Sequence, residues 1–348
     1  MPADYIFYTF SCLFILLTLL PFIKSPYWLI RIWDFPRFQL FCMVFLVLGF
    51  GIFCVKFDFW VKWVFLFLLV ITLVFLFWFI YPYSFLSKKM LIGERESKPE
   101  YKIKLLTANV YQENRKFEKT IELISNSSPD VVFLLEPNSD WKNAMQPLKK
   151  NFPYFIEVPK ENTYGLLFYS KFPIENHEIN YLIDDEIPSI IADLKINNKI
   201  VRVFGIHPTP PVPQENPEST ERDAEILIVG KKAKEFHGPA IVFGDLNDVA
   251  WSHTTRLFLR ISEMLDPRIG RGMFSTFHAK YPLMRWPLDH FFVSSHFRLI
   301  DLKVENGIGS DHFPISITLS IKFELPGKEL EASIDDLKET NEIIQEAR

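Results

Sequence analysis

Acidic and amide side chains follow the ends of apolar segments in the second part of this 348-residue chain. Glu136 comes directly after Val131–Leu135, where a carboxylate costs free energy unless a metal ion or a hydrogen-bond donor compensates it. Asp245 and Asn247 follow the apolar run at 241–243. Carboxylate and amide oxygens suit Mg²⁺, and a carboxylate can also deprotonate water. These residue types therefore favour metal-assisted hydrolysis.

Histidine and further acidic residues occupy similar positions. His207 follows the apolar segment 203–206, and Asp289 precedes the segment 291–293. Residues at strand ends meet at one edge of a sheet, so we expect these side chains to lie together. Each residue alone also fits a turn, a helix cap or a surface loop, and only their joint occurrence favours a site. The full set is Asn109, Glu136, His207, Asp245, Asn247, Asp289, Asp311 and His312.

Short apolar segments that alternate with helical ones must position this set. Residues 117–126 and 220–236 have the pattern of helices, and Asn197-Asn198 predicts a hairpin turn. The alternation of strands and helices, with some antiparallel pairs, predicts a layered α/β or α+β domain. The expected strands are 102–110, 130–135, 165–169, 190–196, 199–205, 240–243, 290–294 and 313–321.

The ordered set of segments resembles the endonuclease/exonuclease/phosphatase superfamily, in particular its bacterial membrane-anchored type. The resemblance extends over most of the chain after residue 101, and one motif alone would be weak. It implies an α/β (α+β) four-layer sandwich of the DNase I-like type, in which two mixed β-sheets pack face to face with helices outside. The matching segments are 107–110, 129–136, 165–173, 204–207, 242–248, 287–294 and 309–315.

The resemblance also implies hydrolysis of a phosphate ester assisted by a divalent metal ion. Mg²⁺ is the expected cofactor, and Mn²⁺ is a possible substitute. Glu136 is the expected metal ligand, with Asn109 as a second contributor and Asp311 as a third candidate. The metal ion would neutralise charge that develops on the phosphoryl oxygens.

Matching positions further imply catalytic roles. Asp245 is expected to orient and deprotonate the attacking water, and Asn247 to hold water or phosphate beside it. His312 is expected to bind the phosphoryl group, or to assist the leaving oxygen, as an imidazolium. Asp289 would hold that ring and raise its pKa, and His207 would be a second donor on the phosphate side.

Two departures from the family pattern bear on the substrate. Tyr111 stands where AP-endonuclease-like members carry an acidic residue, which weakens a DNA-repair interpretation. His207 stands where a Tyr ends the corresponding strand in AP-endonuclease-like members, and a His at this position resembles the deoxyribonuclease and sphingomyelinase branches. The candidate substrate-binding residues are Arg222, Arg271, Thr276 and Arg285, although exposed arginines are usually only solvated.

Three apolar runs precede this domain, at about 5–23, 38–55 and 59–81. Each is long enough to cross a bilayer as a helix. A signal peptide is the alternative for the first run, but no positive segment precedes it and no small-residue cleavage site follows it. We expect a membrane anchor at 1–86, a linker at 87–100, the phosphoesterase domain at 101–323 and a charged tail at 324–348 that forms a surface helix.

Three spans place the N-terminus and the phosphoesterase domain on opposite sides of the membrane. Basic residues of the first loop and of the stretch after the third run outnumber those on the other side, which favours a cytoplasmic domain at a bacterial inner membrane. The linker between the first two runs mixes aromatic and charged residues and is expected to lie on the membrane surface. The basic residues are Lys24, Arg31, Arg37, Lys88 and Lys89, against Lys56 and Lys62.

Charge and anchoring together separate three candidate functions. The net charge is −4, so the composition lacks the basic excess of nucleic-acid-binding proteins. This favours a phosphodiesterase or phosphomonoesterase that acts on a membrane-proximal, lipid-linked substrate and contacts membrane lipids through its spans. A membrane-tethered endonuclease or exonuclease is the first alternative. A non-catalytic binding module is the second, although none of the main catalytic positions is missing.

Overall fold

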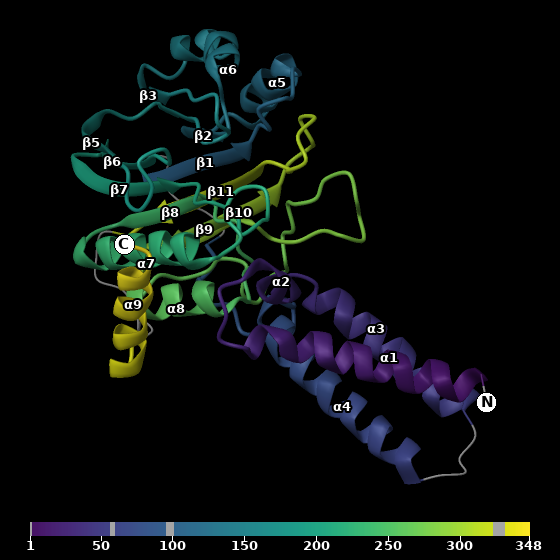
Figure 1. The fold of residues 1–348 in the computed structure, drawn as a ribbon. Coiled ribbons are helices and arrows are strands. Elements are labelled where there is room, and N and C mark those ends of the chain that lie inside the picture. The colour runs from purple at the N-terminus through teal and green to yellow at the C-terminus, as the bar shows by residue number, and fades with distance from the viewer. Residues whose placement is uncertain (1, 56–59, 95–100, 323–330) are drawn as a thin grey trace.

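The computed structural model describes residues 2–55, 60–94, 101–322 and 331–348, which form two parts (Figure 1). The first part contains three long helices and is called the helical bundle below. The second contains two β-sheets and is called the two-sheet domain. In Figure 1 the long helices leave the two-sheet domain from one side and run away from it together.

The helical bundle consists of α1 (Pro2–Leu19), α3 (Arg37–Cys54) and α4 (Trp60–Ile80). Phe7, Val44 and Leu69 are fully buried where these helices pack together. Three stretches of the described chain, Ala3–Phe22, Arg37–Cys54 and Trp60–Tyr83, are long and apolar enough to cross a membrane. The expected apolar runs are therefore helical, while Lys56 and the expected start of the third run at 59 lie outside the described residues.

The first sheet of the domain has six strands, in which β1 pairs in parallel with β2 and the other pairs are antiparallel. The parallel pair places Asn109 opposite Leu135 at the carboxyl ends of both strands. The spatial order is β10 (Phe297–Val304), β11 (Ile315–Ile321), β1 (Lys102–Asn109), β2 (Val131–Leu135), β4 (Leu166–Ser170) and β3 (Tyr154–Val158).

The second sheet has five strands, with one parallel pair between β7 and β8. Asn197 and Asn198 both have positive φ, 49° and 59°, and form the expected tight turn between β6 and β7. The spatial order is β5 (Ile174–Asn180), β6 (Ser189–Ile196), β7 (Lys199–Ile206), β8 (Ala240–Asp245) and β9 (Asp289–Val293).

The two sheets pack face to face on an apolar core. Phe133 of β2 meets Phe243 of β8 edge to face, with 5.1 Å between ring centroids. Helices α5 (Phe117–Ser127) and α6 (Ser139–Ala144) accompany the first sheet, and α7 (Thr220–Glu235), α8 (His253–Ser262) and α9 (Ile334–Glu346) accompany the second (Figure 1). The expected four-layer sandwich, with two mixed sheets flanked by helices, is confirmed.

A third apolar cluster joins the helical bundle to the two-sheet domain. It contains Phe79 and Tyr83 from the bundle side, and Val249, Ala250 and Trp251 from the loop after β8. Tyr83 Oη donates to the Ala250 carbonyl at 2.5 Å, and Trp251 Nε1 donates to the Asp34 carbonyl at 2.7 Å. These buried bonds fix the bundle against the segment that follows Asp245.

The segment between α1 and α3 also packs on the two-sheet domain. It contains α2 (Trp28–Arg31) and the short helix Ile32–Asp34. The Trp28 backbone N–H donates to the Pro217 carbonyl at 2.8 Å, and Tyr27 forms a β-bridge with Glu218. This contact with the domain was not predicted, and the expected position of the segment on a membrane surface stays a prediction.

Residues after the bundle lie along the first sheet rather than apart from it. The Glu94 N–H donates to the Leu299 carbonyl at 2.8 Å, and the Leu299 N–H donates to the Ile92 carbonyl at 2.9 Å. The rest of the expected linker, 95–100, and the expected boundary at 323–324 lie outside the described residues. Helix α9 packs on α7 and α8, buries Thr340 and Ile344, and begins with a Ser333–Asp336 capping box.

Candidate active site

Strand register brings two carboxylates together at one edge of the second sheet. Asp245 is the last residue of β8 and Asp289 the first of β9, and the antiparallel pairing places them opposite each other. Gly244, directly before Asp245, has φ of 140°, and a Cβ at this position would lie 2.0 Å from the Ile206 carbonyl oxygen. Close approach of β7 and β8 therefore requires glycine here.

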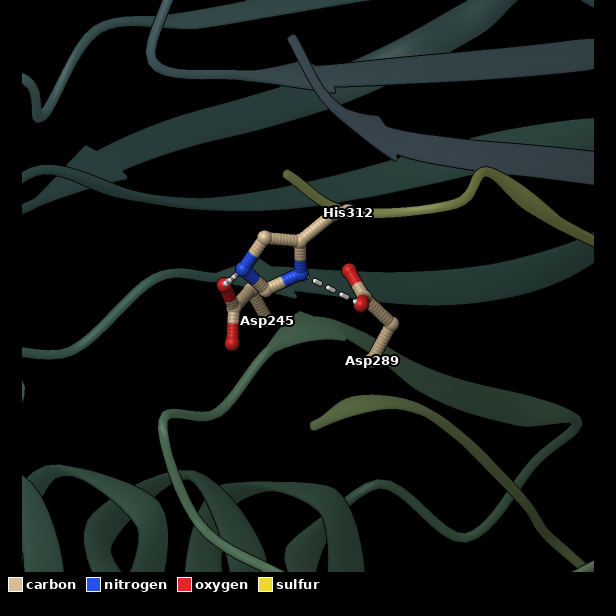
Figure 2. Close-up of side chains that lie close together, drawn as sticks. All are labelled: Asp245, Asp289 and His312. Carbon is tan, nitrogen blue, oxygen red and sulfur yellow. Dashed lines mark hydrogen bonds and ion pairs between the residues drawn. The ribbon is translucent and has the colours of Figure 1, made fainter. Parts of the chain in front are cut away.

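His312 lies between these carboxylates, in the segment that leads into β11 (Figure 2). Its Nδ1 is 2.8 Å from Asp289 Oδ2, and its Nε2 is 3.4 Å from Asp245 Oδ2. All three side chains are buried, and one ligand atom of each lies within 4.8 Å of the others, a spacing at which they could share a metal ion with the imidazole in its neutral form. The His312 backbone N–H donates to Ser310 Oγ at 3.0 Å, which fixes the segment beneath the ring.

The charge state of His312 follows from this arrangement. Burial alone would lower the pKa of the imidazole, but the carboxylates of Asp245 and Asp289 outweigh it and raise the pKa of His312 to about 10. The ring is therefore an imidazolium at neutral pH, and it supplies positive charge between two buried carboxylates.

Glu136 and Asn109 lie on the other side of Asp245. Asn109 Nδ2 donates to Glu136 Oε1 at 2.6 Å and to Asp245 Oδ2 at 3.3 Å, so one amide links both carboxylates. Glu136 has φ of 64°, a left-handed conformation that directs it away from the strand it follows. Burial raises the pKa of Glu136 to about 7, although the Asn109 amide and the His312 charge oppose this shift.

The donor chemistry around Glu136 fits a hard divalent cation. A buried carboxylate with a raised pKa gains stability when a cation lies beside it. Glu136 and Asn109 offer carboxylate and amide oxygens, the ligand types that Mg²⁺ and Mn²⁺ accept. Asp245 and Asp289 add negative charge nearby, and His312 offsets part of it.

His207 completes the cluster from the end of β7. Its Nε2 lies 3.9 Å from Asp245 Oδ2, which makes this oxygen a common neighbour of His207, His312 and Asn109. Burial lowers the pKa of His207, more than the Asp245 carboxylate raises it. The Tyr164 ring covers the imidazole with 5.5 Å between centroids. His207 is therefore a neutral ring beside a charged one.

Asn247 orients Asp245 through its backbone, and its side-chain amide is bound to a neighbouring carbonyl. Its backbone N–H donates to Asp245 Oδ1 at 3.0 Å, and its Nδ2 donates to the Pro208 carbonyl at 2.9 Å. Asn247 has φ of 50°, which asparagine tolerates better than most residues. Arg222 Nη1 donates to the Asn247 carbonyl at 2.8 Å from below.

The other candidate residues lie at differing distances from this cluster. Arg222 is buried, and its Nη2 lies 2.7 Å from Asp223 Oδ1 and 3.6 Å from Asp248 Oδ1, so its charge is paired within the protein. Arg271 donates to the Leu91 and Pro267 carbonyls and holds the segment after the bundle. Substrate binding by either arginine stays a prediction.

Thr276, Arg285 and Asp311 lie closer to His312. Thr276 Oγ1 accepts a hydrogen bond from the Asp289 N–H at 3.3 Å and is fully buried. Arg285 donates to the Ala279 carbonyl at 3.1 Å, and its guanidinium lies 4.8 Å from the Phe313 ring centroid. The Asp311 carbonyl accepts from the Ala279 N–H at 2.6 Å. Thr276 thus supports the site, while the roles of all three residues stay predictions.

Three further residues contact the site and were not among the predicted site residues. The Gln112 N–H donates to Glu136 Oε2 at 3.3 Å, and the Phe277 ring lies 4.8 Å from the His312 ring. Tyr164, over His207, is the third. Gln112 and Tyr164 lie within two positions of the matched segments 107–110 and 165–173, a signal that could have indicated them, whereas Phe277 lies ten positions before the segment 287–294 and had no such signal.

The two mixed sheets flanked by helices form a DNase I-like fold. Solved structures with this fold include humanized D. rerio TDP2 with 14 mutations, at 17% identity and a TM-score of 0.53, covering 63% of this chain and 99% of that one. An endonuclease/exonuclease/phosphatase from Bacteroides vulgatus has 17% identity and a TM-score of 0.52, and the match covers 64% of this chain and 99% of that one. D. rerio TDP2 complexed with single strand DNA product has 17% identity and a TM-score of 0.53, and the match covers 63% of this chain and 99% of that one.

A family model, described as Endonuclease/Exonuclease/phosphatase family, matches residues 106–312. This chain belongs to that family. No curated protein matches it by sequence.

Proposed function

We propose that this protein is a membrane-anchored, metal-dependent phosphoesterase. The observation that carries the proposal is the position of His312 between Asp245 and Asp289, next to the Asn109–Glu136 pair. The cluster combines a fixed positive charge, a carboxylate that can accept a proton, and oxygen ligands for a cation. These are the groups that hydrolysis of a phosphate ester requires.

Glu136 and Asn109 would hold the cation, with Asp311 as a further candidate. Bound Mg²⁺, or Mn²⁺ in its place, would polarise the phosphoryl group and neutralise its developing charge. The Gln112 N–H and the Asn109 amide orient the Glu136 carboxylate before any ligand arrives. This orientation lowers the cost of forming the site.

Asp245 would act on the attacking water. Hydrogen bonds from Asn247 N–H and Asn109 Nδ2 fix both of its oxygens. In the proposed step the water oxygen bonds to phosphorus, the bond from phosphorus to the ester oxygen breaks, and Asp245 takes the proton of the water. The departing oxygen is then protonated by an imidazolium or by solvent.

His312 would stabilise the negative charge of the phosphoryl oxygens, or protonate the leaving oxygen, and Asp289 would hold its ring. A preorganised positive charge in a buried site stabilises developing negative charge more strongly than the same charge does in water. His207 would be a second, neutral donor, since burial lowers its pKa. Asn247 would position Asp245 and the adjacent phosphate.

A membrane-tethered nuclease is the alternative, and a non-catalytic module is the least favoured. The net charge of −4 and Tyr111 in place of an acidic residue both argue against DNA as the substrate. The relative from D. rerio was solved with single strand DNA product, which keeps a nucleic-acid assay in the test. A non-catalytic module would not need the buried carboxylates, which are costly to keep.

The test uses the full chain in lipid nanodiscs with Mg²⁺, with Mn²⁺ and with a chelator. Substrates are a soluble nitrophenyl phosphodiester, a nitrophenyl phosphomonoester and plasmid DNA. Asp245→Ala and His312→Ala are the site variants, and Asp301→Ala, an exposed carboxylate on β10, is the matched control. Metal-dependent hydrolysis lost only in the site variants supports the proposal. Wild-type inactivity on every substrate with both metals contradicts it.

The location of the protein is part of the same proposal. The three helices of the bundle would cross a bacterial inner membrane and leave the two-sheet domain on the cytoplasmic side, as the Lys/Arg distribution favours. Protease digestion of spheroplasts tests the side. An intact domain in sealed spheroplasts that is degraded only after lysis supports a cytoplasmic domain, and degradation in sealed spheroplasts contradicts it.

A further inference from the structure

An exposed apolar loop projects beside the candidate site and is called the 279–285 loop. Backbone bonds between Phe277 and Trp286 close its base. At its tip the exposed fractions are 59% for Tyr281, 85% for Leu283 and 56% for Met284. A loop of a water-soluble domain rarely exposes three large apolar side chains so close together, and such a patch usually marks an interaction surface.

The tip of this loop lies at the level where the second candidate membrane span begins. Gln39 Nε2 donates to the Leu283 carbonyl at 3.0 Å. Gln39 is the third residue of α3, and the candidate span starts at Arg37. With a rise of about 1.5 Å per residue, Gln39 is about 3 Å inside the start of the span. A bilayer around α3 would therefore surround Leu283 as well.

A second apolar projection occurs at the same end of the bundle. Phe85 and Leu86 lie just after the short helix Tyr81–Tyr83 that follows α4, and their exposed fractions are 85% and 77%. Lys280, at the start of the loop tip, is exposed and can direct its charge toward lipid headgroups. Aromatic and basic residues at the edge of an apolar surface are typical of the membrane interface.

The 279–285 loop is also fixed to the candidate site. The Ala279 N–H donates to the Asp311 carbonyl at 2.6 Å, and the Phe277 ring lies 4.8 Å from the His312 ring. Phe277 forms β-bridges with both Trp286 and His312. A loop seated in the membrane would therefore hold the acid–histidine cluster beside the headgroups.

We propose that Tyr281, Leu283 and Met284 insert into the leaflet on the side of the two-sheet domain, and that the substrate is a phosphate ester in the headgroup of a membrane lipid. The substrate half of this proposal rests on the proposed function. The inserted loop removes the exposed apolar surface from water, and the lipid ester reaches the cluster without leaving the bilayer. A soluble ester lacks the tail that holds it at this level.

Insertion is tested with the full chain in nanodiscs of phosphatidylglycerol and phosphatidylethanolamine. Leu283→Cys carries an environment-sensitive fluorophore, with Cys12→Ser, Cys42→Ser and Cys54→Ser as background. Ile179→Cys, an exposed apolar site on edge strand β5 at the far end of the domain, is the control (Figure 1). Spin-labelled lipid is expected to quench the label at 283 at least about twofold more than the label at 179. Equal quenching overturns the inserted loop.

The substrate is tested with two esters that share one leaving group. Hexadecyl nitrophenyl phosphate is presented in vesicles of the same two lipids, and methyl nitrophenyl phosphate in solution. We expect Leu283→Glu with Met284→Glu to lower the ratio of the vesicle rate to the solution rate by about tenfold, because two charges oppose insertion. Ile179→Glu should keep the ratio.

An unchanged ratio in the double variant overturns the role of the inserted loop in presenting the substrate. A wild-type vesicle rate no higher than the solution rate overturns the lipid substrate. Absence of hydrolysis of both esters by the wild type overturns the lipid substrate, and the proposed function falls only if the phosphomonoester and plasmid DNA are not hydrolysed either. The quenching measurement needs no activity, so it still decides insertion in that case.

Discussion

Arg31 Nη2 lies 3.1 Å from Asp223 Oδ2 and joins the segment between the first two candidate spans to α7 of the two-sheet domain. Asp223 also pairs with Arg222, whose Nη1 donates to the Asn247 carbonyl. The Asn247 N–H in turn donates to Asp245. A continuous chain of ion pairs and hydrogen bonds therefore runs from the helical bundle to the candidate catalytic carboxylate.

We expect Arg31→Ala to lower the free energy of unfolding by about 3 kcal/mol, because loss of one partner leaves buried charge uncompensated. Arg31 and Arg222 face Asp223 and Asp248, so the variant leaves two carboxylates with one guanidinium. Chemical denaturation in nanodiscs measures the change. Lys88→Ala, at an exposed position, is the control and should change little. Equal stability of the two variants would show that the pair contributes nothing.

Asp289→Asn should make the activity more sensitive to alkaline pH and the stability less sensitive to it. The pKa of His312 is raised from 6.5 to about 10, so its stabilising contribution is complete below about pH 6.5 and is lost as the pH rises through 10. Removal of the Asp289 charge lowers that pKa. The difference in unfolding free energy between wild type and variant should therefore shrink toward pH 10, and the variant should lose activity at a lower pH. Parallel pH profiles for both proteins would disprove the pairing.

Glu136→Gln should separate stability from function. Burial raises the pKa of Glu136 to about 7, so its carboxylate is costly without a cation, and the neutral amide removes that cost. We expect the metal-free variant at pH 8 to be at least as stable as the wild type. Its metal affinity should fall by about tenfold to a hundredfold and its activity with it. Calorimetric Mn²⁺ titration and thermal denaturation with a chelator measure both, and unaltered metal affinity would exclude Glu136 as a ligand.

Gly244→Ala should displace Asp245. An added Cβ would lie 2.0 Å from the Ile206 carbonyl oxygen, and the φ of 140° is strained for any L side chain. We expect a loss of about 3 kcal/mol or more in unfolding free energy. Gly49→Ala in α3 meets nothing within 4 Å and serves as the matched control, with unchanged or higher stability. A stable, fully active Gly244→Ala protein would contradict the required close approach of β7 and β8.

The fold could be predicted largely because its strands are apolar and its motifs follow in order. The strands buried on both faces, such as β2 and β4, have continuous apolar sequences. Strands β3, β5 and β10 were not predicted. In β5 every residue is exposed or half-buried, so its polar sequence carries no strand signal.

The site was predictable as a set of strand ends but not as a geometry. The sequence places Asp245 and Asp289 beside strands, whereas only the β8–β9 register places them opposite each other. Arg222 belongs to a helix whose charged sequence predicts an exposed surface, yet its side chain is buried. Ion pairs with Asp223 and Asp248 compensate the cost of burying its charge. Pairing of Arg31 with Asp223 spans 192 positions, and local pattern carries no information at that separation.

The same separation bears on how the protein is made. A ribosome delivers Arg31 long before Asp223, so under the proposed anchoring the bundle would enter the membrane while α7 and the strands around Asp245 are still being synthesised. Arg222 pairs with Asp223 and Asp248 within the domain, but the second guanidinium, that of Arg31, reaches them only when the domain folds onto the helical bundle. We expect a chain that starts after the bundle to carry two buried carboxylates against one guanidinium and to mature poorly. Biogenesis would thereby couple catalytic competence to membrane insertion.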